Sequence, residues 1–317
     1  FPTETVYGLG GNALDAEASA KIYAAKGRPS DNPLIVHIAD WEAIRAIVSE
    51  IPEAAKQLAD AFWPGPLTMI LNKSDLVPYA TTGGLETVAV RMPVNPIARA
   101  LIRAGGGYVA APSANTSGRP SPTKAEHVAE DLNGKIDMII DGGTVDIGLE
   151  STIVDLTDGA PTILRPGYIN QEMLTKVLGE VEMDRGLIAP ESGVHPKAPG
   201  MKYRHYAPKA DLIIVEGEAE KVRRKINELV QQQISEGKKV GVIGTDESLS
   251  YYKDGDVRSI GSRKDEITIA QHLFGLLREF DESDISVIYS EAFETPQIGQ
   301  AIMNRLIKAA GHQIIRV

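Results

Sequence analysis

The chain has 317 residues, of which 43% are hydrophobic, a formal net charge of −10 and no cysteine. This length predicts two domains with enough apolar residues for two cores, and the lack of cysteine excludes disulfides, thiolate catalysis and cysteine-ligated metals, as fits a cytoplasmic protein. The acidic balance argues against a protein that grips a long nucleic-acid backbone, and no run resembles a membrane span or a signal peptide.

Short apolar runs alternate with helical patterns over residues 1–180. Asp15 predicts the cap of a helix that ends at Gly27, and Pro52 interrupts a longer helical pattern. Helices are expected at residues 15–27, 41–63, 95–106 and 121–134, and strands at residues 33–39, 67–73, 87–93, 108–115, 136–143 and 151–156. This alternation predicts a mixed α/β domain. Because the chain opens at Phe1 without a methionine, we expect a segment of this domain to be missing before it.

Residues 181–210 contain several prolines and glycines and show no period, which predicts a linker or an extended loop. Its run KYRHYAP, residues 202–208, is cationic and aromatic, whereas a plain tether is rich in Gly and Ser. We therefore expect this linker to contact something. Residues 211–317 then alternate apolar strands with helices, which predicts a small three-layer Rossmann-like parallel α/β domain.

The stretch KGRPSDNP, residues 26–33, places two cations and an amide in a stiff loop before an apolar strand. Lys26 and Arg28 suit the dipole at the end of the preceding helix, which is one explanation for them. The other is an anion site, because the two prolines hold Lys26, Arg28 and Asn32 in a rigid loop that aims them in one direction. His37, within the strand, is interpreted as a core residue unless its strand end borders a pocket.

Polar residues also follow the other predicted strands. Arg91 and Arg165 stand at strand ends, and a buried arginine needs either a protein carboxylate or a ligand carboxylate. The loop at residues 109–123 follows a strand, where open α/β sheets bind ligands, and it offers Ser113, Asn115, Thr116, Ser117, Arg119, Ser121 and Thr123. The segment FPTETVYGLGG fits an exposed turn as well as a ligand loop that presents Thr3 and Thr5.

These strand ends predict one shared site. Lys26, Arg28, Arg91 and Arg165 would meet there in an otherwise acidic domain, which suits a triphosphate and a carboxylate. The chain has no P-loop and no HExxH motif, and its histidines lack zinc-ligand spacing. The motif GLGGNA is a poor dinucleotide site, because the strand before it is polar and Asp40 lies too far downstream.

Seven ordered motifs resemble the YrdC-like family. They are FPTETVYGLG, KGRPSDNPLIVH, WPGPLT, VAVRMP, APSANTSGRPSPT, the run from DGG to GLESTIVD, and LRPG. The tail APGMKYRHYAP, with the α/β pattern after it, resembles the long two-domain form of this family, the threonylcarbamoyl-AMP synthases. The resemblance covers essentially the whole chain. It implies a YrdC-like domain with a mixed twisted sheet over residues 1–180, a linker or lid over 181–210, and the Rossmann-like domain over 211–317.

The resemblance also implies an activity and a site. The family joins L-threonine, bicarbonate and ATP into L-threonylcarbamoyladenylate, releases pyrophosphate, and supplies enzymes that modify the adenosine next to the tRNA anticodon. By motif, threonine would contact Thr3, His37, Arg91, Ala111 and Ser151, with Arg91 facing its carboxylate. ATP would contact Lys26, Asn32, Thr87, Ser113, Asn115, Ser121, Arg165 and Tyr203, and Mg²⁺ is expected to accompany it. Lys26, Arg28 and Arg91 would neutralise charge during the reaction, with Arg28 added for its charge, and Tyr203 would make the linker a lid.

Two alternatives remain. The chain could instead be a carbamoyltransferase-type enzyme, because those enzymes contain a related domain. The motif PGMKYRHYAP argues against this alternative. An RNA-binding module without catalysis is the other, and the net charge of −10 with only 5% aromatic residues argues against a large RNA face. We expect little direct tRNA binding, no membrane contact, and transfer of the product to a separate tRNA threonylcarbamoyl transfer complex.

Overall fold

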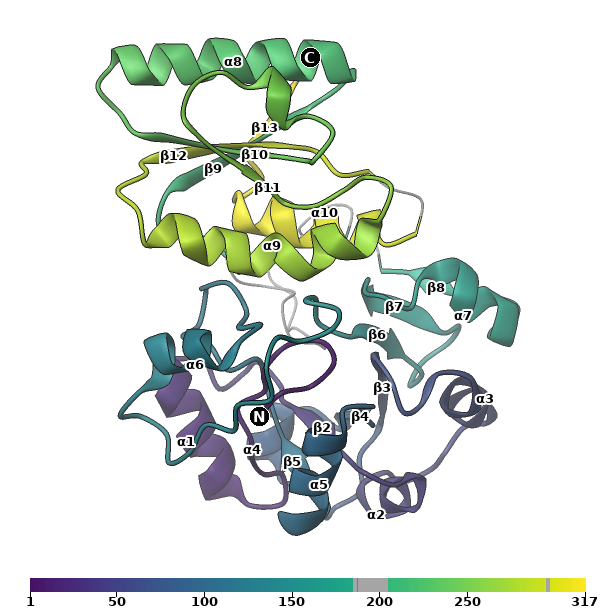
Figure 1. The fold of residues 1–317 in the computed structure, drawn as a ribbon. Coiled ribbons are helices and arrows are strands. Elements are labelled where there is room, and N and C mark those ends of the chain that lie inside the picture. The colour runs from purple at the N-terminus through teal and green to yellow at the C-terminus, as the bar shows by residue number, and fades with distance from the viewer. Residues whose placement is uncertain (185–186, 188–204, 295–296) are drawn as a thin grey trace. The chain divides into compact units, whose positions relative to one another are not determined.

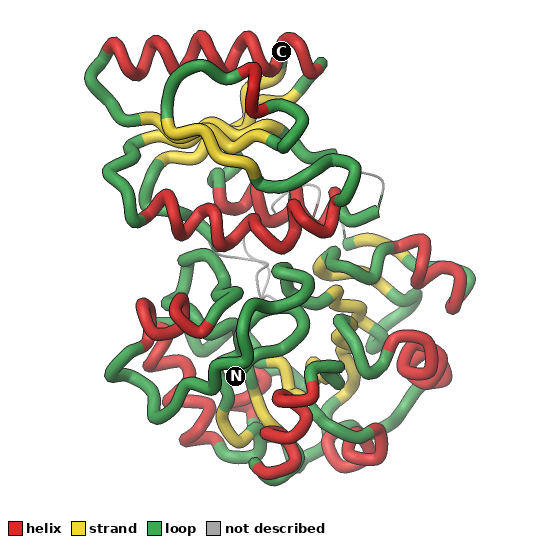
Figure 2. The backbone as a smooth tube through the Cα atoms, viewed as in Figure 1, coloured by secondary structure: helices red, strands yellow, loops and turns green. Residues whose placement is uncertain are grey.

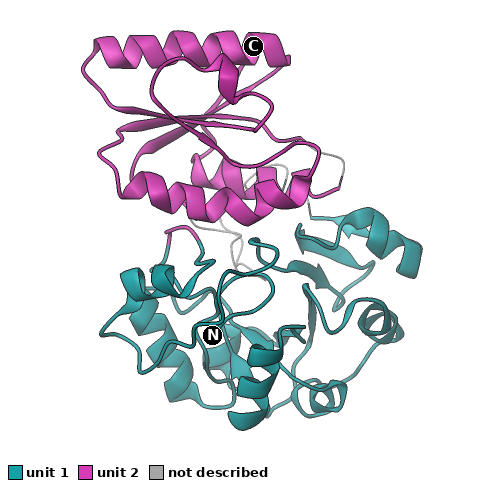
Figure 3. Cartoon of the chain, viewed as in Figure 1, with its two compact units in different colours: residues 1–117, 121–203 teal, residues 118–120, 204–317 magenta. Residues whose placement is uncertain are grey.

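The computed structural model contains the whole chain and describes residues 1–184, 187, 205–294 and 297–317 (Figure 1). It divides into two compact units (Figure 3). Unit 1 comprises residues 1–117 and 121–203, and unit 2 comprises residues 118–120 and 204–317. Among the described residues, none of the helices combines the length and the apolarity that a membrane span needs.

Unit 1 is built on an eight-stranded sheet with the order β1-β5-β2-β4-β3-β6-β7-β8. The strands are β1 (Gly11–Asn12), β2 (Ile35–His37), β3 (Leu67–Asn72), β4 (Thr87–Arg91), β5 (Val109–Ala110), β6 (Thr152–Asp155), β7 (Thr162–Arg165) and β8 (Glu182–Met183). The pairs β2–β4, β3–β6 and β7–β8 are parallel, and β1–β5, β2–β5, β3–β4 and β6–β7 are antiparallel. The predicted mixed sheet is therefore confirmed.

Unit 1 also contains helices, and local chemistry marks both ends of the first of them. They are α1 (Ala16–Lys26), α2 (Ile44–Ile47), α3 (Glu53–Phe62), α4 (Tyr79–Thr82), α5 (Pro96–Ala104), α6 (Ala125–Leu132) and α7 (Gln171–Leu178), and a 3-10 turn (Trp41–Ala43) precedes α2. Asp15 accepts the backbone N–H of Glu17 at the start of α1, and Gly27 ends this helix with a φ of +61°. Lys26 is thereby placed on the last turn of α1, beside the loop that follows.

Strand β4 shows how the sheet separates its two faces. Val88 and Val90 belong to the main apolar core, which also contains residues of α1, α3, α6 and α7. Ala89, in contrast, belongs to a small apolar cluster with residues of β2, β3, β6 and β7. Because side chains alternate along a strand, Arg91 lies on the same face as Ala89 and away from the main core.

Unit 2 has a five-stranded parallel sheet with the order β11-β10-β12-β9-β13. The strands are β9 (Asp211–Glu216), β10 (Val240–Gly244), β11 (Asp256–Ser259), β12 (Val287–Glu291) and β13 (Ile314–Arg316), and a 3-10 turn spans Leu249–Tyr251. Helix α8 (Ala219–Ser235) covers one face, and α9 (Glu266–Asp281) and α10 (Gly299–Ala309) cover the other (Figure 2). This arrangement confirms the predicted three-layer parallel domain.

The structure corrects several predicted elements. Residues 136–143 form no strand. Ile136 and Ile139 pack against the core from a loop, and Met138 is 69% exposed, so the apolar run is not a sheet segment. The predicted break of the helical pattern at Pro52 is confirmed, because α2 ends at Ile47 and α3 begins at Glu53. The patterns did not predict β1, β8, β11, α4 and α7. Strands β1 and β8 have only two residues each, and β11 is an edge strand whose residues are all half-buried, so none of the three shows a clear apolar period.

Candidate functional site

The register of the unit 1 sheet gathers distant motifs into one row. Arg91 on β4 has His37 on β2 as its Cα partner on one side and Thr68 on β3 on the other. Thr68 pairs in turn with Ile153 on β6, and Ile153 pairs with Arg165 on β7. The predicted site residues His37, Arg91 and Arg165 therefore lie along a single line across five strands.

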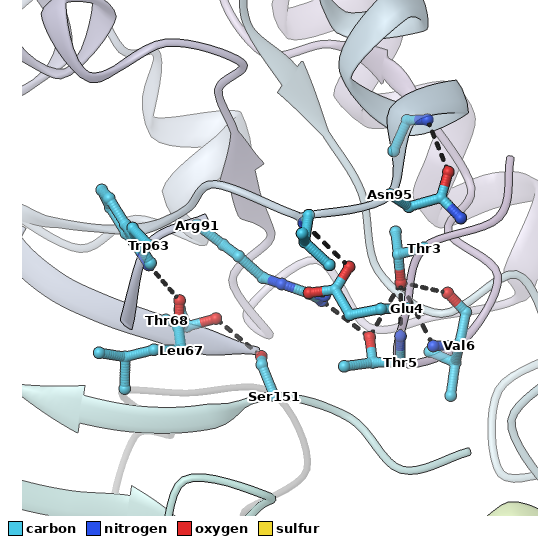
Figure 4. A network of polar contacts seen from close by, with 12 residues as sticks. Thr3, Glu4, Thr5, Val6, Trp63, Leu67, Thr68, Arg91, Asn95 and Ser151 are labelled. Carbon is cyan, nitrogen blue, oxygen red and sulfur yellow. Dashed lines mark hydrogen bonds and ion pairs between the residues drawn. The ribbon is translucent and has the colours of Figure 1, made fainter. Parts of the chain in front are cut away.

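Arg91 is held inside the protein by its terminal nitrogens (Figure 4). Its Nη2 donates to Oε1 of Glu4 at 2.6 Å, its Nη1 donates to Oγ1 of Thr5 at 2.8 Å, and the Arg91 and Glu4 side chains are only 4% and 3% exposed. The anion that a buried Arg91 requires is thus a protein carboxylate. Its Nε, however, is buried and has no hydrogen-bond partner among the described residues.

An unpaired buried donor costs about 1–3 kcal/mol, so it favours an acceptor supplied from outside the chain. A ligand carboxylate matches this requirement, because an arginine edge binds carboxylate oxygens with charge-assisted hydrogen bonds. The two alternatives for Arg91, a protein carboxylate and a ligand carboxylate, are therefore compatible on one guanidinium.

The segment that carries Glu4 is organised around the hydroxyl of Thr3 (Figure 4). Oγ1 of Thr3 donates to the carbonyl of Val6 at 2.7 Å and accepts the backbone N–H groups of Thr5 and Val6. It also lies 2.9 Å from Oγ1 of Thr5. This buried turn brings Thr3, Glu4 and Thr5 next to Arg91.

Ser151 contacts side chains from two strands, β3 and β7. Its Oγ lies 2.7 Å from Oγ1 of Thr68 and accepts a hydrogen bond from Nη2 of Arg165 at 3.2 Å. Nε of Arg165 donates to the carbonyl of Ser151 at 3.0 Å. The predicted threonine contact Ser151 and the predicted ATP contact Arg165 are thus direct neighbours.

His37 is a buried, neutral histidine. It is 3% exposed, and its Nδ1 lies 3.1 Å from the carbonyl of Ile35. Burial, followed by the charge of Arg91, lowers the pKa of His37 to about 3. The imidazole is therefore uncharged near neutral pH and is a weak base, so it suits hydrogen bonding rather than proton abstraction.

The KGRPSDNP cations bind backbone carbonyls. The ammonium of Lys26 donates to the carbonyl oxygens of Ser113 and Asn115, which ties α1 to the loop after β5. Arg28 donates from Nε to the carbonyl of Asn32 and from Nη2 to that of Pro33. Among the described residues, Oδ1 of Asn32 is buried without a hydrogen-bond partner, which again favours a group from outside the chain.

The remaining predicted residues lie in three settings. Ala111 is buried and donates its N–H to the carbonyl of Ile35, next to the row, and Ser121 donates to Oε1 of Glu150 at 2.5 Å. Thr87 begins β4, four residues before Arg91, so the structure places it about 13 Å along the strand from the row. Tyr203 and most of the predicted lid at residues 181–210 lie outside the described residues, and Glu182–Met183 of that range form strand β8.

Sequence reasoning missed four residues of this network: Glu4, Thr68 and Glu150 entirely, and Thr5 as a partner of Arg91. The available signal was their position within the motifs, since Glu4 and Glu150 are acids flanked by Thr or Ser, and Thr68 is a hydroxyl in an apolar strand. Their partners are distant in sequence, up to 87 residues for Glu4 and Arg91, so the pairing itself could not be read from spacing.

Comparison with known proteins agrees with this geometry. A family model described as Telomere recombination (Sua5_yciO_yrdC) matches residues 1–167, and a model described as Threonylcarbamoyl-AMP synthase, C-terminal domain, matches residues 169–311. The chain is 55% identical to a threonylcarbamoyl-AMP synthase of Pyrococcus abyssi, with 100% of this chain and 91% of the relative covered. It is 51% identical to that of Bacillus subtilis, with 100% and 90% covered.

A solved structure is also similar over the full chain. The crystal structure of P. abyssi Sua5 complexed with L-threonine has a TM-score of 0.95 and 53% identity, and the match covers 100% of this chain and 91% of that one. The second family model and both relatives are described as threonylcarbamoyl-AMP synthases, and the first model covers the N-terminal half of the chain. The chain therefore belongs to the threonylcarbamoyl-AMP synthases, the long two-domain form of the YrdC-like family.

Proposed function

We propose that this chain makes L-threonylcarbamoyladenylate from L-threonine, bicarbonate and ATP, with release of pyrophosphate. The observation that carries the proposal is the buried Nε of Arg91, which lacks a partner among the described residues and lies in a row with His37, Thr68 and Arg165. The complex of the P. abyssi relative with L-threonine supports L-threonine as a ligand of this chain.

Threonine would bind with its carboxylate against Nε of Arg91. The hydroxyl of Ser151 and the neutral ring of His37 would provide hydrogen bonds to the rest of the amino acid. A neutral imidazole fits this role, because a charged one would compete with Arg91 for the carboxylate. The threonine amine would stay free to attack.

The reaction would proceed in two bond-forming steps. The neutral amine attacks bicarbonate or CO2 and forms an N-carboxylate. Water is released when bicarbonate is the source, and a proton passes to solvent when CO2 is the source. An oxygen of this N-carboxylate then attacks the α-phosphate of ATP, the bond to the β-phosphate oxygen breaks, and pyrophosphate leaves. Both reactants of the second step are anions, so the protein's task is to align them and neutralise charge.

The polar network fits this task. Arg165, bonded to Ser151, would place the α-phosphate beside the threonine site, and the loop held by Lys26 would carry Ser113 and Asn115 to the nucleotide. Ser121, fixed by Glu150, would contact ATP from the same loop. Arg28 would hold phosphate or bicarbonate.

Mg²⁺ would enter with ATP. This ion binds substrate phosphates and keeps several waters, so it needs few protein ligands. The part of the chain that the structure describes has no group of three or more His, Asp or Glu side chains that could hold a metal ion. The residues present therefore fit an ion held by the phosphates, and no step is assigned to a protein-bound metal. The product would pass to a separate enzyme complex that modifies the adenosine next to the tRNA anticodon.

The test is pyrophosphate release from ATP. We expect release that requires both L-threonine and bicarbonate and yields threonylcarbamoyl-adenylate by mass spectrometry. Release that continues unchanged without threonine would refute the proposal. Filter binding at physiological salt separates the RNA-binding alternative, because tight tRNA binding without ATP turnover would favour that function instead.

A further inference from the structure

Glu4 is a buried carboxylate with both oxygens engaged. Oε1 accepts from Nη2 of Arg91 at 2.6 Å, and Oε2 accepts the backbone N–H of Val94 at 3.3 Å. Val94 follows the end of β4, whereas Glu4 lies in the turn built by Thr3 (Figure 4). Glu4 therefore fastens the Thr3 turn to the strand end that carries Arg91.

This attachment determines how the guanidinium is presented. Glu4 and Thr5 take one N–H each from the two terminal nitrogens of Arg91, and Nε is the nitrogen left without a partner. A guanidinium bound at its terminal nitrogens cannot rotate without losing both bonds. Its Nε–H then keeps one direction, as a site for a planar carboxylate requires.

The charges of Glu4 and Arg91 also indicate that the orientation of the guanidinium matters. Glu4 balances Arg91 within the buried pair, so the pair as a whole offers an incoming carboxylate little net charge. The Nε–H is then a donor of fixed position on the one nitrogen without a partner among the described residues, and its usefulness depends on alignment more than on attraction. Small displacements of Glu4 should therefore weaken carboxylate binding even when the charge is kept.

We propose that Glu4 is a positioning residue for the amino-acid substrate: it sets the orientation of Arg91 and holds the Thr3 turn against it. This inference rests on the proposed function, in which Arg91 receives the carboxylate of L-threonine. Glu4 itself touches neither the substrate nor the reacting atoms. Its loss should therefore appear in the KM for threonine rather than in the KM for ATP.

The decisive variant is Glu4→Asp, which keeps the negative charge and shortens the side chain by one methylene. An aspartate cannot reach Arg91 and Val94 together from the same backbone. We expect the KM for L-threonine in pyrophosphate release to rise about tenfold, the loss typical of one charge-assisted hydrogen bond. The KM for ATP should stay within about twofold, and the threonine-induced rise in melting temperature, which needs no turnover, should shrink.

Unit 2 supplies a matched control. Glu291 is also a buried glutamate with both oxygens engaged, by Nη2 of Arg263 at 2.6 Å and by the hydroxyl of Tyr252 at 2.6 Å. Glu291→Asp makes the same chemical change in a pair outside the row. It should lower the melting temperature and leave the KM for threonine within about twofold of the wild type.

Thr5→Val keeps the test decisive if Glu4→Asp does not fold. It removes the acceptor of Nη1 without changing any charge, and it should also raise the KM for threonine selectively. A KM for threonine within about twofold of the wild type in Thr5→Val, and in Glu4→Asp where that folds, would overturn the inference. Tighter threonine binding in Glu4→Asp would also overturn it, because Glu4 would then compete for Arg91. Failure of the proposed function is distinguishable, since the wild type itself would show no threonine-dependent release.

Discussion

Replacing Arg91 by methionine would leave the carboxylate of Glu4 buried without its counter-charge. The two side chains are 4% and 3% exposed, and 2.6 Å separates Nη2 from Oε1. Breaking such a pair from one side costs about 3–5 kcal/mol, because the remaining charge is uncompensated. At about 2–4 °C per kcal/mol for a domain of this size, unit 1 of Arg91→Met should melt about 6–20 °C below the wild type.

The double variant Glu4→Gln/Arg91→Met removes both charges and should recover part of this loss. For side chains in direct contact, the coupling free energy is typically about 0.5–3 kcal/mol. Neither variant should show a threonine-induced rise in melting temperature, since both lack the Nε–H donor. The double variant thereby separates stability from ligand binding, because it regains part of the stability but not the threonine-induced rise in melting temperature.

Tryptophan fluorescence is the assay of choice. The chain has 2 tryptophans, Trp41 and Trp63, and both lie in unit 1, so thermal melts followed by fluorescence report that unit alone. The wild type, the single variants Glu4→Gln and Arg91→Met, and the double variant would be compared at one pH and one protein concentration. If the double variant lost as much stability as the two single variants together, the charges would be uncoupled and the reasoning would be wrong.

Two further predictions concern the same row. Thr68→Val keeps the shape of the side chain but removes its hydrogen bond to Ser151, worth about 1 kcal/mol, so the KM for threonine should rise about fivefold in the pyrophosphate assay, and an unchanged KM would exclude this contribution. The folded-state pKa of His37, about 3, lies below the ordinary value of 6.5, so the unfolded chain binds more protons between these values. Stability should therefore fall as pH drops from about 6.5 towards 3, by up to about 1.4 kcal/mol per pH unit, and His37→Gln should flatten this decline in melting temperature between pH 7.5 and 5. Parallel curves for the wild type and His37→Gln would contradict the assignment.

Local chemistry explains the elements that the sequence predicts well. The helix at residues 15–27 can be predicted from the sequence because Asp15 caps it and Gly27 ends it. Both signals act on backbone groups within a few residues. Strands β9, β10 and β12 of unit 2 can be predicted because a parallel sheet covered on both faces requires continuous apolar runs. The apolar run at residues 136–143 shows the limit of this reasoning: a strand also needs a neighbouring strand with which to pair, and no local pattern supplies one.

The candidate site likewise has features that the sequence predicts and features that it does not. From the residues alone, cations and hydroxyls at strand ends indicated an anion site, and the ordered motifs indicated the family. The tertiary structure decided which of them meet. Strand register, fixed by pairing between segments far apart in the chain, placed Arg91 between His37 and Thr68 and left Thr87 at the other end of β4.

The partner of Arg91 was equally hidden from sequence. A buried guanidinium requires an anion, and that requirement is visible in the residue type. Which anion meets it depends on the turn built around Thr3, which brings Glu4 to Arg91 across 87 positions of sequence. The sequence by itself therefore determined the chemistry that the site has available. Only the tertiary structure decided which groups already satisfy one another and which donor is left for a substrate, because hydrogen bonds join neighbours in space rather than neighbours in sequence.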